Sequence, residues 1–250
     1  MNMKNRWMRI LTSVALVLSV GRGQTYPRWF LDPAEIGCGR SVAGFSASSY
    51  YADSAISRAA KNARENYARE KMTSVIGGQL FWATENGNYW MGSDFVELYD
   101  TAASETALAN MEPADSVANK GLTLFLLVDK GCKPDPNSLR KMAMRREAPA
   151  WTESPTHDPN GLYAVGVAPE YYYEVSSWLA AERNARRNLA RSVVIALASV
   201  QKVNSHEGQD LRREQMSVNL HSISVAARWR DYDKKIFFVL IRAPREVNMR

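Results

Sequence analysis

The chain of 250 residues lacks the short motifs by which common enzyme classes are recognised. It has no glycine-rich phosphate loop, no G-x-S-x-G, no H-E-x-x-H and no C-x-x-C. Histidine is scarce too: there are only three, in no spacing that is typical of metal ligands. These absences predict a protein without enzymatic activity, and we expect no cofactor and no metal ion.

Cysteine is almost as rare, with Cys38 and Cys132 as the only two. No spacing rule links this pair, so the sequence leaves a disulfide and two free thiols open. An exported chain meets an oxidising space, where a disulfide is chemically permitted.

Long apolar runs are absent except near the N-terminus. There, Lys4, Arg6 and Arg9 precede an apolar stretch over residues 10–20, and small residues follow it. This order predicts a secretory signal peptide over residues 1–23, with an uncleaved anchor as the alternative. We therefore expect an exported protein without a transmembrane span in its mature chain.

The chain also has no excess of acidic residues, since its net charge is +6 and its pI is about 9.3. Four of the 32 basic residues and none of the 26 acidic residues lie in 1–23, so the rest of the chain has a net charge of about +2. That small excess argues against a nucleic-acid partner.

What the chain does contain is a repeat at a spacing of 122 residues. Residues 27–79 and 149–201 align without a gap and share 16 of 53 positions, about four to five times the chance level. The phrase NARENYAR at 62–69 returns as NARRNLAR at 184–191. We interpret this as a tandem duplication.

The repeat predicts an α+β fold made of two small β-α-β-β modules, each with a helix packed on an antiparallel sheet. We expect the first copy over 24–130 and the second over 149–250. A basic linker over 131–148 would join them, with a short helix over 138–145.

Periodicity places the elements of each module. Helical spacing predicts helices over 51–75 and 173–201, with Gly77 and Gly78 ending the first. Short apolar runs with a central glycine predict the first strands. The remaining strands are expected at 94–100, 122–128, 217–231 and 234–244.

The repeated phrase also supplies candidate binding residues. Its arginines are donors for an anion, and the tyrosines before each helix can stack on a planar ligand or line an interface. The alternative is structural: the arginines would form a solvated helix face, and the tyrosines would close the helix entrance. The candidate residues are Tyr51, Arg64, Arg69, Tyr173, Arg186 and Arg191.

Several stretches of the second copy resemble the LPP-twenty lipoprotein family of bacterial envelope proteins. They are PAW at 149–151, LYAVGVAP at 162–169, AAERNARRNLAR at 180–191 and KIFFVLIRAP at 235–244. The match extends over about 100 residues and is looser in the first copy. The resemblance implies the β-α-β-β fold and a cell-envelope protein.

From this resemblance and the missing catalytic motifs, we expect a protein that acts by association with itself or with envelope proteins, in an outer-membrane or motility-associated assembly. Family members are commonly lipid-anchored through a cysteine directly after the signal. No cysteine stands there in this chain, so we expect no lipid anchor and a location in the periplasm, at the outer membrane or outside the cell. The alternative is a module that binds a small planar or anionic ligand.

Overall fold

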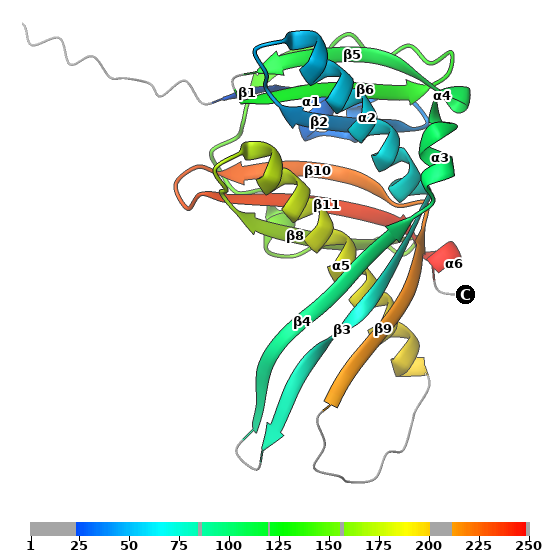
Figure 1. Ribbon diagram of the computed structural model, residues 1–250, viewed down its shortest axis with the longest axis vertical. Helices are drawn as coiled ribbons and strands as arrows, with labels where there is room; N and C mark the ends of the chain where they lie inside the picture. Colours follow the sequence, from blue (N-terminus) through cyan, green and yellow to red (C-terminus); the bar gives the residue numbers. More distant parts are fainter. Residues whose placement is uncertain (1–23, 85–86, 120, 156–157, 201–211, 249–250) are drawn as a thin grey trace, which may run out of the picture.

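The computed structural model describes residues 24–84, 87–119, 121–155, 158–200 and 212–248. The predicted signal peptide lies outside the described residues. Within them, helices pack on antiparallel sheets, which confirms the predicted α+β class. Two α+β units lie one above the other, and a further sheet projects from them (Figure 1).

The first unit consists of β2 (Ser41–Ala47), α2 (Ala52–Lys71), β5 (Met111–Asn119) and β6 (Leu122–Asp129). Its strands stand in the order β2-β6-β5, and α2 packs against β2 and β6. The central strand β6 is buried over most of its length, as its continuous run of apolar residues requires.

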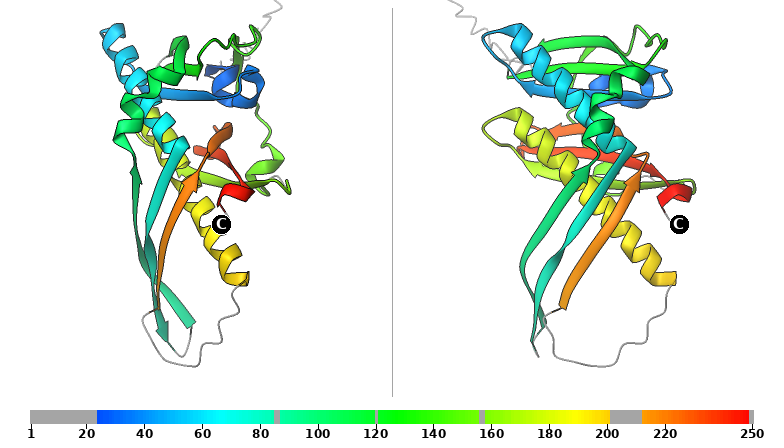
Figure 2. Two further views of the ribbon diagram at one scale, coloured as in Figure 1. Left: turned by 90° about the vertical axis from the view of Figure 1, so that its right-hand side faces the viewer. Right: turned by 45° about the vertical axis from the view of Figure 1, so that its right-hand side comes forward.

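The second unit consists of β8 (Gly161–Pro169), α5 (Glu174–Val200), β10 (Ser224–Asp231) and β11 (Ile236–Pro244). Its strand order is β10-β11-β8. In both units the first strand lies at an edge and the last strand lies in the centre. The two helices run in roughly the same direction (Figures 1 and 2). The duplication itself remains an interpretation of the sequence.

Each helix lies directly on the glycine of the first strand in its unit. A Cβ atom on Gly44 would stand 2.2 Å from the carbonyl oxygen of Ala59, and one on Gly166 would stand 2.0 Å from that of Ala181. Such distances leave no room for a side chain. The glycines and alanines that recur at a spacing of 122 therefore permit the close approach of helix and strand.

The projecting sheet consists of β3 (Met72–Thr84), β4 (Gly87–Tyr99) and β9 (Arg212–His221), in the order β4-β3-β9. Two of these strands follow α2 in the chain, and the third follows α5. The sheet therefore joins the two halves of the sequence, and it extends away from both units (Figure 2).

The predicted end of the first helix is wrong. α2 ends at Lys71, and Gly77 and Gly78 lie inside β3. The β-branched residues Thr73, Val75 and Ile76 favour a strand, and β3 pairs on both sides, with β4 and β9. Gly77 has a φ of +145°, and a Cβ atom there would stand 1.9 Å from the carbonyl oxygen of Asp94.

Two strand predictions also need correction. Residues 94–99 form a strand, but they belong to β4 in the projecting sheet, and β5 takes the expected place in the first unit. The sequence of β5 is polar and contains Pro113, which lies at a register shift of this edge strand. The predicted strand over 217–231 is split between β9 and β10, because Ser222 adopts a φ of +53°.

The predicted helix over 138–145 is wrong as well. A turn occupies its start, where the backbone N–H of Ser138 donates to the carbonyl oxygen of Asp135 at 2.9 Å. The strand β7 (Lys141–Ala143) follows and pairs with β1 (Thr25–Pro27). The shorter helical elements are α1 (Arg28–Leu31), η1 (Pro33–Ile36), α3 (Thr101–Glu105), α4 (Ala107–Asn110), η2 (Ala150–Thr152) and α6 (Arg245–Asn248).

A cluster of buried aromatic rings fills the space between the units. Phe30 lies edge-on to Phe45 of the first unit at a centroid distance of 5.9 Å, and to Trp178 of the second at 5.4 Å. Trp178 in turn lies 4.7 Å from Phe237. One continuous hydrophobic core therefore holds the two units together.

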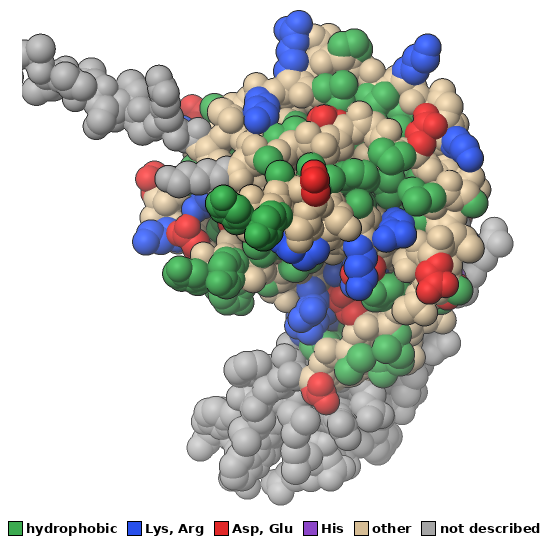
Figure 3. Space-filling model, turned by 45° about the horizontal axis from the view of Figure 1, so that its top comes forward, with side chains coloured by type: hydrophobic (Ala, Val, Ile, Leu, Met, Phe, Trp, Pro, Cys, Tyr) green, Lys and Arg blue, Asp and Glu red, His purple; other side chains and the backbone are tan. Residues whose placement is uncertain are grey.

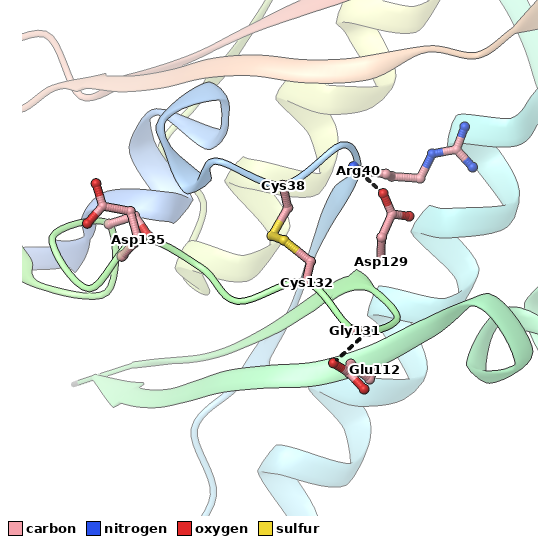
Figure 4. The surroundings of a disulfide bond; sticks show 8 residues. Cys38, Arg40, Glu112, Asp129, Gly131, Cys132 and Asp135 are labelled. Carbon is pink, nitrogen blue, oxygen red and sulfur yellow. Dashed lines mark hydrogen bonds between the residues drawn. A yellow bond between two sulfur atoms is a disulfide. The ribbon is translucent and has the colours of Figure 1, made fainter.

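Cys38 and Cys132 form a disulfide, with 5.9 Å between their Cα atoms (Figure 4). Of the two possibilities that the sequence left open, the structure has the bonded one. The bond joins the segment before β2 to the segment after β6. Asp129, at the end of β6, links the same two segments, because its side chain accepts a hydrogen bond of 2.7 Å from the backbone N–H of Arg40.

Candidate functional site

The asparagines of the repeated phrase attach each helix to its first strand. In the first unit, Asn62 accepts a hydrogen bond of 3.0 Å from the backbone N–H of Phe45. Asn66 donates one of 2.9 Å to the carbonyl oxygen of Ala43. Both amides therefore occupy backbone groups of β2 that no neighbouring strand takes up.

The second unit repeats this arrangement at the equivalent positions. Asn184 and Asn188 donate hydrogen bonds of 2.8 Å to the carbonyl oxygens of Val167 and Val165. Because β2 and β8 are edge strands, these amides cover edges on which another chain could otherwise pair. The asparagines thus have a structural role.

The last arginine of each phrase lies on an aromatic ring of β4. The guanidinium carbon of Arg69 is 4.2 Å from the ring centre of Tyr99, and that of Arg191 is 5.0 Å from the ring centre of Phe95. Phe95 and Tyr99 are four residues apart and point to the same face of the strand. Two of the predicted binding residues are therefore brought to one strand.

The first arginines of the phrases differ in their surroundings. Arg186 is buried and forms an ion pair of 2.9 Å with Glu97 of β4. Arg64 is half-buried, and within the part of the chain that the structure describes it forms no ion pair. The inner face of β4 thus receives arginines from both helices, through Phe95, Glu97 and Tyr99.

The outer face of the projecting sheet carries exposed aliphatic side chains. Ile76, Val96 and Leu98 are 40%, 51% and 52% exposed. Ile76 and Val96 are direct neighbours across β3 and β4. Among the described strands, β4 has a partner on one side only, so these side chains adjoin a free backbone edge. The sequence predicted a strand at residues 94–100, but it gave no signal that this strand belongs to a separate, projecting sheet.

The tyrosines before each helix face the solvent. Tyr51 and Tyr173 are 71% and 59% exposed, and each lies edge-on to the preceding tyrosine, at centroid distances of 5.2 and 4.9 Å. Those preceding residues, Tyr50 and Tyr172, are even more exposed. Hydrophobic side chains stand out at one side of the molecule in Figure 3. The pairs are surface features, and they do not meet the predicted arginines at any contact that the described residues make.

A cluster of buried charges lies between the two units. Arg228 of β10 forms an ion pair of 2.6 Å with Glu182 of α5 and donates a hydrogen bond of 2.8 Å to the carbonyl oxygen of Phe30. Glu70 of α2 is buried beside them, next to a cavity of about 10 Å³, which is room for about one water molecule. The sequence did not indicate this cluster, because its members are far apart along the chain.

Burial raises the pKa of Glu70 to about 8, and the negative charge of Glu182 adds to this effect. The positive charges of Arg228, Arg40 and Arg186 act in the opposite direction. A carboxyl group whose pKa lies near neutrality changes its charge within the physiological range. Here that group sits where the two units meet.

Among residues 24–84, 87–119, 121–155, 158–200 and 212–248, no three His, Cys, Asp or Glu side chains are grouped so that they could hold a metal ion. No helix in these ranges combines the length and apolar character that crossing a membrane requires. The chain matches no protein-family model, and no curated protein or solved structure matches it either. What can be inferred about its function therefore depends on the geometry of the described residues.

Proposed function

We propose that the protein is an exported cell-envelope protein without enzymatic activity, and that it acts by association through the projecting sheet. One observation carries this proposal: the sheet bears Ile76, Val96 and Leu98 on its outer face beside the free edge of β4. Exposed aliphatic residues on an open strand edge favour pairing with another chain.

The geometry favours a second copy of this chain as the partner. An antiparallel edge strand can pair with itself about a two-fold axis, so that the same surface serves both subunits. In such a dimer, two β4 strands would form one continuous six-stranded sheet. Val96 and Leu98 of both copies would then lie on one apolar face.

The inner face of β4 supports this role because it is held in place. Glu97 is bound by Arg186, and the rings of Phe95 and Tyr99 lie under Arg191 and Arg69. A strand that is fixed before binding loses less conformational entropy when a partner pairs with it. The arginines of the repeated phrase thus serve the contact indirectly, by positioning the strand.

The disulfide supports export, since such bonds persist in oxidising compartments. The resemblance of the second copy to LPP-twenty proteins supports the cell envelope as the destination, in an outer-membrane or motility-associated assembly. With no cysteine after the predicted signal, the protein would be held there through its partners.

Sedimentation velocity over a range of protein concentrations tests the proposal. We expect a concentration-dependent dimer for the mature chain, and a monomer for the variant with Val96→Lys and Leu98→Lys. Two like charges on each edge would repel those of the second copy and would need to be buried. Leu108→Lys is the matched control, because Leu108 is 47% exposed on α4 and lies outside the sheet.

The control variant should dimerise like the unmodified chain. A mature protein that stays monomeric at every concentration, and that brings no envelope protein through purification from its native cells, would contradict the proposal. Equal loss of the dimer in the Leu108→Lys variant would show that the contact lies elsewhere.

A further inference from the structure

The repeated phrase differs in charge at one position, where the first copy has Glu65 and the second has Arg187. In the first unit, Glu65 lies 3.4 Å from Arg69 and neutralises it. In the second unit the same helix position carries another positive charge. In the first unit, the last arginine of the phrase therefore has a carboxylate beside it, and its counterpart Arg191 does not.

In the second unit, two arginines share one ring. The guanidinium carbons of Arg187 and Arg191 are 5.3 and 5.0 Å from the ring centre of Phe95. Neither arginine forms an ion pair with any residue that the structure describes. The charge of Glu97 acts on Arg187, but Arg186 hydrogen-bonds one oxygen of that carboxylate, and the other oxygen has no hydrogen-bond partner among the described residues. Positive charge is thus in excess here.

The state of Arg187 reflects that excess. Burial lowers the pKa of Arg187, and the positive charges of Arg183, Arg191 and Arg186 lower it further, against the opposing effect of Glu97. Its terminal nitrogen donates to the carbonyl oxygen of Phe95 at 3.3 Å, whereas its Nε atom is buried and has no hydrogen-bond partner among the described residues. A buried donor without a partner calls for an acceptor, and the charge of Arg187 is not neutralised by an ion pair within the described residues.

A pocket of about 250 Å³ lies at this place. Asn184 and Asn188 line it as well, and each side-chain amide gives one of its two hydrogens to β8. Lys and Arg side chains gather near the middle of the face shown in Figure 3. The residues that line the pocket are Phe95, Val167, Asn184, Arg187, Asn188 and Arg191.

We infer that this pocket binds a small anion with a phosphate group, in the role that the Glu65 carboxylate has in the first unit. Arginine forks bind phosphate oxygens with two parallel hydrogen bonds, and the two amides add donors to the remaining oxygens. The pocket is smaller than the sites that hold drug-sized ligands, so it suits a free phosphate ion or the terminal phosphate of a small molecule.

The site lies within one copy of the chain, so it does not depend on dimer formation through the projecting sheet. It includes Arg191 from the predicted binding residues but not Arg186, whose charge is taken up by Glu97. Arg187 and Asn184 were not among the predicted residues. The signal for Arg187 was present in the comparison of the two phrases, as the change from Glu65, whereas Asn184 is the same residue in both.

Isothermal titration calorimetry of the mature chain in about 0.15 M NaCl, where long-range charge effects are screened, tests this site. The probes are inorganic phosphate and glycerol phosphate, in a buffer without phosphate. We expect saturable binding of one anion per chain. Arg187→Glu restores the residue of the first copy and should weaken binding at least tenfold.

Arg183→Glu is the matched control, since Arg183 lies on the same helix, is exposed and does not line the pocket. It should change the affinity less than threefold. If Arg187→Glu perturbs the circular dichroism spectrum, Arg191→Gln replaces it, with the same expectation. Tighter binding of glycerol phosphate would identify the ligand as a phosphorylated small molecule, and tighter binding of phosphate would identify the free ion. Absence of saturable binding for both probes, or equal weakening by both glutamate substitutions, would overturn the inference.

Discussion

The two helices that carry the repeated phrase rest on their strands in the same way but face different neighbours. The shared residues, such as Asn66 and Asn188, attach each helix to its own sheet. Among the residues that differ, Glu65 pairs with Arg69 of its own helix, whereas Arg187 lies on the ring of Phe95 in the projecting sheet. The shared asparagines therefore serve each unit by itself, whereas the shared Arg69 and Arg191 both contact the projecting sheet. At the position of Glu65 and Arg187, the two helices differ in charge.

Substitution of the glycines beneath the helices should disturb the packing that the two units share more than any other change. Gly44→Ala and Gly166→Ala would each place a Cβ atom within 2.2 Å of helix backbone atoms, so helix and strand must separate. We expect either substitution to lower the free energy of unfolding by about 3 kcal/mol, the upper range for overpacking. Urea denaturation measures it.

Gly39→Ala serves as the control, because a Cβ atom there meets only the side chain of Asp129. It should cost much less than either of the two substitutions beneath a helix. If one of those two substitutions proved neutral, the two helices would not be packed in the same way.

The buried Glu70 sharpens the contrast, because the equivalent residue in the second copy is Ser192. With a folded pKa of about 8 against an ordinary value of 4.5, Glu70 binds its proton more tightly in the folded state. Its stabilising effect is complete below pH 4.5 and is lost as the pH rises towards 8.

Glu70→Gln should remove this dependence. The variant and the unmodified chain would have similar free energies of unfolding at pH 5, and at pH 8 the variant would be more stable by a few kcal/mol. Denaturation at a series of pH values measures the difference. A parallel loss of stability with pH in both proteins would show that another group is responsible.

The smallest expected effect belongs to the shared asparagines. Asn66→Ala and Asn188→Ala each remove one hydrogen bond to an edge strand, at a cost of about 1 kcal/mol. Thermal unfolding of the two variants would compare the halves directly. A markedly larger effect in one unit would mean that its helix depends more on this bond.

Local pattern was enough to predict the helices and the first and last strands of each unit. The matched alanines and glycines mark where each helix contacts a strand, and both contacts are found in the structure. Pattern failed for β5, because its residues are polar and Pro113 interrupts them. It also failed for the projecting sheet, whose strands come from both halves of the chain and pair over a long distance in sequence.

The candidate sites were predictable to a similar extent. Arg69 and Arg191 were predicted, but the rings of Tyr99 and Phe95 on which they lie were not. A contact between residues so far apart leaves no trace in one sequence. The buried cluster around Glu70 was missed for the same reason.

β3 can pair with β9 only after most of the chain has been made, so the pairing of these two strands is a late step in folding. Val75 pairs with Val218, so the second edge of β3 stays open until nearly the whole chain is available. Pairing between such distant segments is slow, and an unpaired edge is prone to aggregate. If the chain is exported as we propose, the first unit arrives on the far side of the membrane long before β9. Until β9 arrives, a chaperone that binds unpaired strand edges would bind the open edge of β3.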